Sequence, residues 1–236
     1  MKLIALDSSG AVASVALFTD GKLLGEYSID HKSTHSQTLL PMLDELCRRT
    51  DFDPAEAEAI AVASGPGSFT GLRIGGAAVK GMAMALDIPV LPVPTLEGLC
   101  YRAVEWPGLI CPMMDARRQQ VYSGIFRFEE GKLKTVFGAE ALSAEEQIRR
   151  LNEAKEAVYL LGDGTDACSE LIASALNCEY RIAPQPLRYQ SAAAVGMRAM
   201  DLGREAFVDA AAFVPVYLRR SQAEREREER LAKEEA

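Results

Sequence analysis

The chain repeats one order of structural elements, and this repetition constrains the fold more than any other feature. In each half a short apolar strand ends on an aspartate, and an extended run and a turn at Asp20-Gly21 or Glu130-Gly131 follow. A helix, a strand, a glycine loop and a second helix complete each half. The expected elements span residues 3–7, 12–18, 23–27, 36–49, 59–63, 70–86 and 89–93, and then 109–115, 121–128, 143–153, 157–161 and 165–176. This order predicts two similar α/β units in tandem.

The boundary between the units is expected near residues 102–108, where Trp106-Pro107-Gly108 interrupts the pattern. We therefore assign residues 1–103 to the first unit and residues 104–220 to the second. Within the second unit, residues 191–204 predict an Ala-rich helix. Residues 221–236 form a charged tail, whose last 14 residues hold six acids and four bases. Such a tail is expected to be a solvated, fraying helix or disordered, with a partner-binding segment as the alternative.

Charge and hydropathy exclude several classes of protein. The 236 residues carry 26 Lys and Arg against 34 Asp and Glu, a net charge of −8, whereas a protein that holds nucleic acid by itself concentrates positive charge. Every apolar stretch ends before the length of about 18 residues that a membrane span needs, and Asp7 comes too early for a signal peptide. The five cysteines lack CxxC spacing, as expected of reduced thiols. We expect a cytoplasmic protein without membrane contact.

The most specific local motif is the glycine-rich string Gly65-Pro66-Gly67-Ser68-Phe69-Thr70-Gly71-Leu72-Arg73, between an expected strand and an expected helix. Backbone N–H groups at a helix start attract anions, so Gly67, Ser68 and Thr70 are candidate nucleotide or anion ligands. The spacing does not match a GxxxxGK[ST] phosphate loop. The alternative interpretation is a tight strand-to-helix turn in which glycine allows close backbone packing.

The helix expected at residues 70–86 carries two apolar stripes side by side. One stripe holds Leu72, Gly75, Val79, Met82 and Leu86, and the other holds Ile74, Ala77, Ala78, Gly81 and Ala85. A helix that lies on a sheet with its back to water needs an apolar arc of only about 100°. This helix should therefore be covered on two sides, either by the second unit of the same chain or by another molecule.

Other chemistry-bearing residues give weaker signals. His31 and His35 have HxxxH spacing, but they lie in a polar stretch before the helix at 36–49, and a surface loop explains them better than a metal site. Asp7 and Asp115 each end a strand, and Ser8 after Asp7 is a candidate phosphate ligand. Gly162 and Gly164 belong to a second glycine loop that is a candidate contact for a nucleobase. No set of nucleophile, base and oxyanion donors emerges.

Five strings taken together resemble the TsaB family, also called YeaZ. They are Ile4-Ala5-Leu6-Asp7-Ser8-Ser9, His35-Ser36-Gln37 before Leu39-Leu40-Pro41, Ser64 to Arg73, Asp115-Ala116-Arg117 to Val121-Tyr122, and Pro215-Val216-Tyr217-Leu218-Arg219. The resemblance implies an actin-like, Hsp70-like ATPase (ASKHA) fold of two tandem RNase-H-like units. It also implies a role in forming N6-threonylcarbamoyladenosine at position 37 of tRNAs that read codons beginning with A. The implied partners are the transferase TsaD, the ATPase TsaE and a second copy of the chain, with tRNA reached indirectly.

The sequence departs from the TsaD pattern at the metal ligands. TsaD-like enzymes have His-Leu-Glu-Gly-His after an Ile-Pro strand, and the corresponding residues here are Thr95-Leu96-Glu97-Gly98-Leu99. Thr95 and Leu99 replace both histidines, and neither is a plausible ligand for that metal. The comparison predicts an accessory subunit without catalytic residues, metal or intrinsic cofactor, and with ATP or ADP only in the multi-subunit complex. A metallopeptidase is nearly excluded by the same two residues.

The predicted docking surface uses the helices at 36–49 and 71–86. Its candidate residues are Leu39, Leu43 and Leu46 from the first helix, and Leu72, Gly75, Val79 and Met82 from the second. On this hypothesis, replacing Val79 with glutamate buries an unpaired charge in the interface. The alternative function is a nucleotide-dependent enzyme of the same fold that acts alone through Asp7 and the loops near Gly67 and Gly162.

Overall fold

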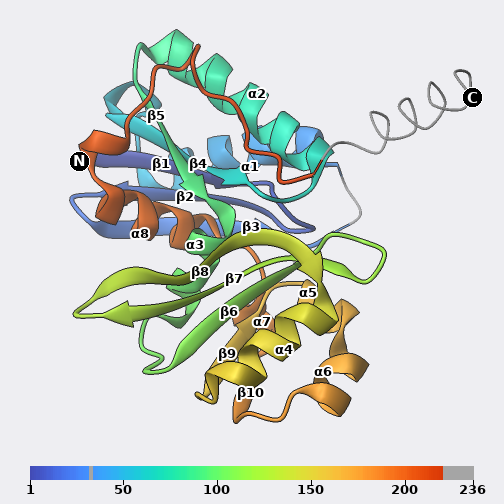
Figure 1. Cartoon of the computed structure of the whole chain (residues 1–236). Coiled ribbons are helices and arrows are strands. Elements are labelled where there is room, and N and C mark those ends of the chain that lie inside the picture. Colours follow the sequence, from blue (N-terminus) through green and yellow to red (C-terminus); the bar gives the residue numbers. More distant parts are fainter. Residues whose placement is uncertain (32–33, 220–236) are drawn as a thin grey trace, which may run out of the picture.

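The computed structural model, which describes residues 1–31 and 34–219, contains two five-stranded sheets with the same topology (Figure 1). The first is ordered β3-β2-β1-β4-β5 and the second β10-β9-β6-β7-β8. The strands are β1 (Lys2–Asp7), β2 (Ala13–Thr19), β3 (Lys22–Ile29), β4 (Ala59–Gly65), β5 (Val90–Pro94), β6 (Leu109–Asp115), β7 (Gln120–Glu129), β8 (Lys132–Ser143), β9 (Val158–Leu161) and β10 (Tyr180–Ile182). The predicted tandem repeat is confirmed.

The two sheets also agree in strand direction. Strand β1 is antiparallel to β2 and parallel to β4, and β6 is antiparallel to β7 and parallel to β9. The predicted turns join β2 to β3 and β7 to β8. In both turns the acid and the glycine have positive φ, 50° and 79° at Asp20 and Gly21 and 51° and 75° at Glu130 and Gly131. This is the geometry of a two-residue type I′ hairpin, which is why each turn carries a glycine.

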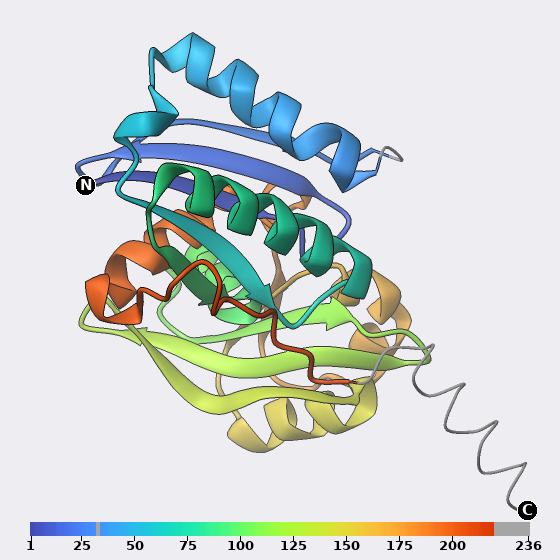
Figure 2. The ribbon, with the colours of Figure 1, turned by 90° about the horizontal axis from the view of Figure 1, so that it is seen from above.

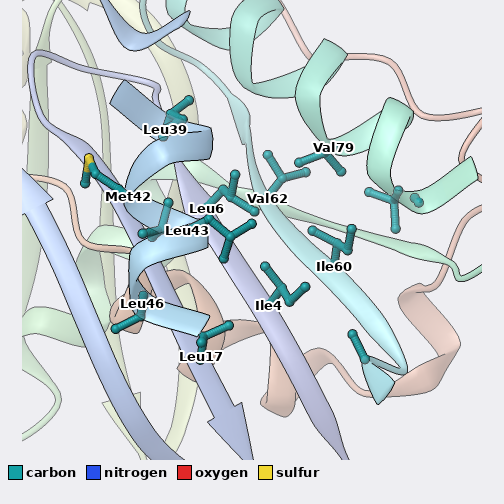
Figure 3. Close-up of a cluster of buried hydrophobic side chains, with 14 of the residues drawn as sticks. Ile4, Leu6, Leu17, Leu39, Met42, Leu43, Leu46, Ile60, Val62 and Val79 are labelled. Carbon is teal, nitrogen blue, oxygen red and sulfur yellow. The ribbon is translucent and has the colours of Figure 1, made fainter. Parts of the chain in front are cut away.

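Helices α1 (His35–Thr50) and α2 (Phe69–Leu86) lie side by side on one face of the first sheet (Figure 2). Their buried residues meet Ile4, Leu6, Leu17, Ile60 and Val62 from the strands in one apolar cluster (Figure 3). Helix α1 begins at His35, one residue before the expected start at residue 36. Its cap is Thr34, which makes no side-chain capping bond.

The opposite face of the first sheet is covered by helix α8 (Ala192–Leu202), which the sequence assigned to the second unit. Ala192, Val195 and Ala199 pack against Leu3 and Phe18 there. The physical reason is the composition of β1 and β4, whose residues on both faces are apolar and buried, so that the sheet needs a helix on each side. The chain therefore returns to the first unit after completing the second sheet.

The second sheet is also covered on both faces. Helices α4 (Ala144–Ala154) and α6 (Ser169–Ala175) bury its outer face, and α3 (Thr95–Cys100) packs on the inner face and against α8. The short helices are α5 (Gly164–Ala167) and α7 (Gln185–Arg188), with 3-10 turns at Pro54–Glu56, Tyr101–Ala103 and Arg204–Ala206. The single helix expected at residues 165–176 is thus two short helices, α5 and α6.

The segment 207–219, here called the C-terminal strap, runs back along α2 (Figures 1 and 2). Val208 forms a β-bridge with Val90, and Val216 N–H donates to the Ser64 carbonyl at 2.7 Å. The Lys80 ammonium donates to the carbonyls of Ala211 and Phe213 at 2.9 and 3.2 Å. The strap covers a side of α2 other than those that face the sheet and α1. Part of the covering predicted for the apolar surface of this helix therefore comes from the same chain.

No helix in the described ranges is long and apolar enough to cross a membrane. The charged tail at 221–236 lies outside the described residues, so its predicted state is not addressed by this structure.

Candidate functional site: the cleft between the units and the α1–α2 face

A cleft of about 540 Å³ lies where the carboxyl ends of β1, β4 and β6 approach each other. This edge of a sheet is where α/β folds bind ligands. The lining comes from the loop after β1, the start of α2, the turn after β6, Asp163 and the strap. It comprises Ser9, Gly10, Ala11, Gly67, Ser68, Phe69, Thr70, Met114, Asp115, Ala116, Arg117, Tyr122, Asp163, Tyr217, Leu218 and Arg219.

The two strand-ending aspartates make the same turn in both units. Asp7 Oδ1 accepts from the Ser9 N–H at 2.8 Å, and Asp115 Oδ1 accepts from the Arg117 N–H at 2.7 Å. Asp7 also accepts from the Ser9 hydroxyl at 2.6 Å. These hydrogen bonds hold each carboxylate against its own loop, so both aspartates stabilise the conformation of the turn that follows them.

Burial raises the pKa of two aspartates near the cleft, Asp7 and Asp163. Asp7 is only 2% exposed, and desolvation raises its pKa from 3.8 to about 6 although the Ser9 hydrogen bonds oppose the shift. Asp163, which accepts from the Asp115 N–H at 3.1 Å, also has a pKa raised by burial. Within residues 1–31 and 34–219, no group of three His, Cys, Asp or Glu side chains is placed to hold a metal ion.

In the string at 65–73, the protein's own backbone occupies the space beside the glycines. A Cβ at Gly67 would lie 2.3 Å from the Ser9 carbonyl oxygen, and one at Gly71 would lie 2.1 Å from the Ser8 carbonyl oxygen. The Ser8 hydroxyl donates to the Gly71 carbonyl at 2.9 Å, and the Ser68 hydroxyl caps α2 by accepting from the Gly71 N–H at 3.2 Å. Close packing of α2 on the loop after β1 accounts for the string, in line with the tight-turn interpretation.

The glycines of the second loop also pack closely against backbone atoms. A Cβ at Gly162, whose φ is +95°, would lie 2.1 Å from the Met113 carbonyl oxygen, and one at Gly164 would lie 2.8 Å from it. Neither glycine lines the cleft, whereas Asp163 between them does. Of the candidate nucleotide residues, Gly67, Ser68 and Thr70 line the cleft, while Asp7 and Ser8 are buried behind it.

His35, Thr95 and Leu99 all make contacts that stabilise the packing of the chain. His35 Nε2 donates to the Gly10 carbonyl at 2.9 Å, and His31 is exposed. The Thr95 hydroxyl, buried at the start of α3, accepts from the Gly65 N–H at 3.1 Å. Leu99 belongs to the apolar cluster between α3 and the second sheet.

Most of the predicted docking residues face the core of the protein. Six of the seven, Leu39, Leu43, Leu46, Leu72, Gly75 and Val79, are buried, and Met82 is half-buried. Leu39, Leu43, Leu46 and Val79 are among the side chains of the buried cluster in Figure 3. A Cβ on Gly75 would meet the Ser8 hydroxyl, and Val79 is 0% exposed in the cluster over the first sheet. The helical spacing of these residues is that of the buried stripe facing the core. Val79→Glu would therefore disrupt the fold rather than test an interface.

The exposed apolar residues of this face lie beside that stripe. Leu40 on α1 is 46% exposed and Met84 on α2 is 65% exposed. Ala77, Gly81 and Ala85 on α2 are exposed as well. A groove of about 780 Å³ runs between the helices and is lined by residues that include Leu40, Asp44, Arg48, Phe52, Met82, Ala85 and Leu86. We call the groove with these exposed residues the α1–α2 face.

Comparison with known proteins identifies the family. The model of the family TsaD, tRNA N6-adenosine threonylcarbamoyltransferase, matches residues 23–227. The tRNA threonylcarbamoyladenosine biosynthesis protein TsaB of Bacillus subtilis is 33% identical over 228 residues, which cover 95% of this chain and 96% of that protein. The chain belongs to the TsaB family. TsaB of Escherichia coli K12 is 28% identical over 174 residues, covering 72% and 75% of the two chains.

Solved structures agree with this assignment of the TsaB-family chain. YeaZ from Pseudomonas aeruginosa superposes with a TM-score of 0.78 at 28% identity, covering 92% of this chain and 99% of that one. An inorganic polyphosphate/ATP-glucomannokinase from Arthrobacter superposes with a TM-score of 0.53 at 13% identity over 85% and 99% of the two chains, which shows a shared fold. The actin-like ATPase (ASKHA) fold of two repeated units is thus confirmed.

Proposed function

We propose that this TsaB-family chain is the accessory subunit that docks with a TsaD-type transferase in the formation of N6-threonylcarbamoyladenosine at position 37 of tRNAs reading ANN codons. The Bacillus and Escherichia relatives are named as tRNA threonylcarbamoyladenosine biosynthesis proteins, which supports the pathway. The observation that carries the docking role is the α1–α2 face, where Leu40 and Met84 are exposed beside an apolar groove.

The composition of the face suits another pair of helices. Ala77, Gly81 and Ala85 are small and exposed on α2, so the backbone of a second helix can approach closely there. We propose that a transferase of the TsaD family, whose model matches residues 23–227 of this chain, has helices in corresponding positions. Two such pairs, from a second copy or from the transferase, would form a four-helix contact across a pseudo-twofold axis. We therefore propose homodimers that exchange for heterodimers.

Several features support a subunit that performs no chemistry itself. Thr95 and Leu99 occupy the positions of the metal-binding histidines, and Thr95 is engaged with the Gly65 backbone. In both glycine loops the chain's own backbone occupies the space beside the glycines, where a phosphate would have to approach. We propose that the chain holds no metal and no cofactor of its own, that ATP or ADP binds only in the assembled complex with TsaE-type ATPase, and that it works in the cytoplasm.

Light scattering coupled to size exclusion tests the proposal. The chain alone is expected at twice its 25.6 kDa mass, and it should convert to a one-to-one complex when its own organism's transferase is added. Met84→Glu and Leu40→Glu place a charge in the contact and should weaken the complex by about a hundredfold. Val136→Glu is the matched control, because Val136 is 40% exposed on β8, away from this face.

Each outcome has a clear meaning. Equal affinity of the Met84 and Val136 variants for the transferase would refute the assignment of the face. A wild-type chain that ignores the transferase would refute the accessory role. Threonylcarbamoylation of tRNA should require both proteins, with neither active alone.

The alternative function, a nucleotide-dependent enzyme that acts alone, draws its support from the 540 Å³ cleft. Calorimetric titration of the isolated chain with Mg-ATP distinguishes the two functions. Tight binding with turnover by the isolated chain would favour the enzyme.

A further inference from the structure

The rim of the cleft holds arginines without carboxylate partners. Across the described residues most arginines pair with an acid, namely Arg48, Arg49, Arg117, Arg127, Arg149, Arg150, Arg188, Arg198 and Arg204. Five described arginines form no such pair. Of these, Arg219 lines the cleft, Arg73 stacks on the lining residue Phe69, and Arg118 follows the lining residue Arg117 in the sequence. Three guanidinium groups without a carboxylate partner thus lie near one cleft, although the chain as a whole has a net charge of −8.

Direct contacts connect these groups into one surface, here called the arginine rim. The Arg73 guanidinium lies 3.9 Å from the centroid of the Phe69 ring, and that ring lies 4.8 Å from the Tyr217 ring. Arg219 follows in the strap and donates to the Ala116 carbonyl at 2.7 Å, across the cleft. Arg117 and Arg118 come next in the chain. The rim therefore spans both units.

The backbone holds the outer part of the rim in an unusual conformation. Arg117, Arg118 and Gln119 have φ of 65°, 57° and 57°, a left-handed run without any glycine. Arg117 and Arg118 point to solvent, and Arg117, whose side chain is 88% exposed, lies 3.3 Å from Asp115. Non-glycine residues in this sparsely populated conformation cost energy and cluster at functional sites.

The chemistry of the cleft limits where an anion can sit. Asp115 and Asp163 line its floor, and the glycine loops that would cradle a phosphate are filled by the Ser8, Ser9 and Met113 backbone. An anion is repelled from the floor and attracted to the rim. Exposed guanidinium groups beside aromatic rings match the phosphodiester backbone of RNA, which offers a row of charges to a surface.

We infer that the arginine rim binds backbone phosphates of the tRNA within the assembled complex. This inference rests on the proposed accessory function, which brings the chain to tRNA. The net negative charge of the chain opposes RNA binding by the isolated subunit, so the contact adds to binding that the partner supplies.

Binding of unmodified tRNA to the complex of this chain with its transferase tests the inference. Fluorescence anisotropy is measured from 50 to 200 mM salt with Arg73→Glu, Arg118→Glu and Arg181→Glu. Each rim variant should lower tRNA affinity about five- to tenfold and reduce the slope of log affinity against log salt by about 0.7–0.9. Arg181 is also exposed and without a carboxylate partner, but it lies on β10, none of whose residues lines the cleft, and its variant should match the wild type.

The other outcomes separate the inference from its premise. Intact complexes whose tRNA affinity is unchanged in both rim variants would overturn the rim and leave the accessory function standing. An equal loss in Arg181→Glu would also overturn it, because the effect would then be one of net charge. Rim variants that fail to assemble would show that the rim contacts protein rather than RNA. Failure of the wild type to assemble would refute the proposed function itself.

Discussion

Replacing Asp7 with asparagine should stabilise the folded chain at neutral pH. Asp7 is buried beneath the cleft, and burial raises its pKa from 3.8 to about 6. An asparagine keeps the Oδ1 acceptor for the Ser9 N–H and hydroxyl, which lie at 2.8 and 2.6 Å. The substitution therefore removes a charge that the fold must desolvate and preserves the turn.

The sign and size follow from proton linkage. Below pH 4 the carboxyl is protonated in both the folded and the unfolded chain, so it imposes no charge penalty. Between pH 4 and pH 6 the unfolded chain loses its proton first, and the stability of the wild type falls as pH rises. Above pH 6 the full difference in pKa applies, which corresponds to about 3 kcal/mol. Asp7→Asn should gain up to that amount at pH 7.5 and almost nothing at pH 4.

Urea denaturation at pH 4.5, 6 and 7.5, at one protein concentration, measures this difference. Asp30→Asn is the control, because Asp30 is exposed and its substitution should change the free energy of unfolding by a small amount. Asp163 contributes to the pH dependence of both the wild type and Asp7→Asn, so it cancels in their difference. A difference between wild type and Asp7→Asn that is the same at all three pH values would refute the reasoning.

Two further predictions test the packing of the site. Gly71→Ala should destabilise the chain by about 1–3 kcal/mol, because the new Cβ would meet the Ser8 carbonyl, whereas Gly81→Ala in the same helix has open space and should stabilise it by about 0.5–1 kcal/mol. Urea midpoints measure both, and shifts of the same sign would contradict the packing role of the string. Thr95→Val leaves the Gly65 N–H without its acceptor and should cost about 1–3 kcal/mol without changing affinity for the transferase. An unchanged urea midpoint would show that this hydrogen bond contributes nothing.

The repeated order of elements could be predicted because each element carries a local signal. The hairpin turns carry glycine where φ is positive, and the strands that end on Asp7 and Asp115 are short apolar runs. Helix α3 and strand β10 carry no comparable signal. Helix α3 has only six residues and β10 only three, too short for hydrophobic periodicity to identify.

The docking residues could not be assigned from periodicity alone. A stripe at helical spacing marks the side of a helix that is buried, and both the sheet and a partner bury residues with this spacing. In α2 the stripe containing Val79 faces the sheet, and the exposed Met84 lies off it. The strap that covers the Lys80 side of α2 is more than 120 residues away in sequence, which no local pattern reveals.

The two units show how one duplicated element can serve two purposes. Asp7 and Asp115 accept the same hydrogen bond from the N–H two positions later, so the two turns have equivalent geometry. In the first unit the aspartate is followed by the small residues Ser8 and Ser9, whose backbone packs against Gly71 and Gly67, and both serines are buried. In the second unit Ala116 and Arg117 take the places of Ser8 and Ser9, and Arg118 takes that of Gly10. Arg117 and Arg118 stay at the surface in a left-handed conformation. The residues that follow each aspartate therefore decide whether its loop packs against a helix or stays at the surface, while the strands that position the two loops have the same topology.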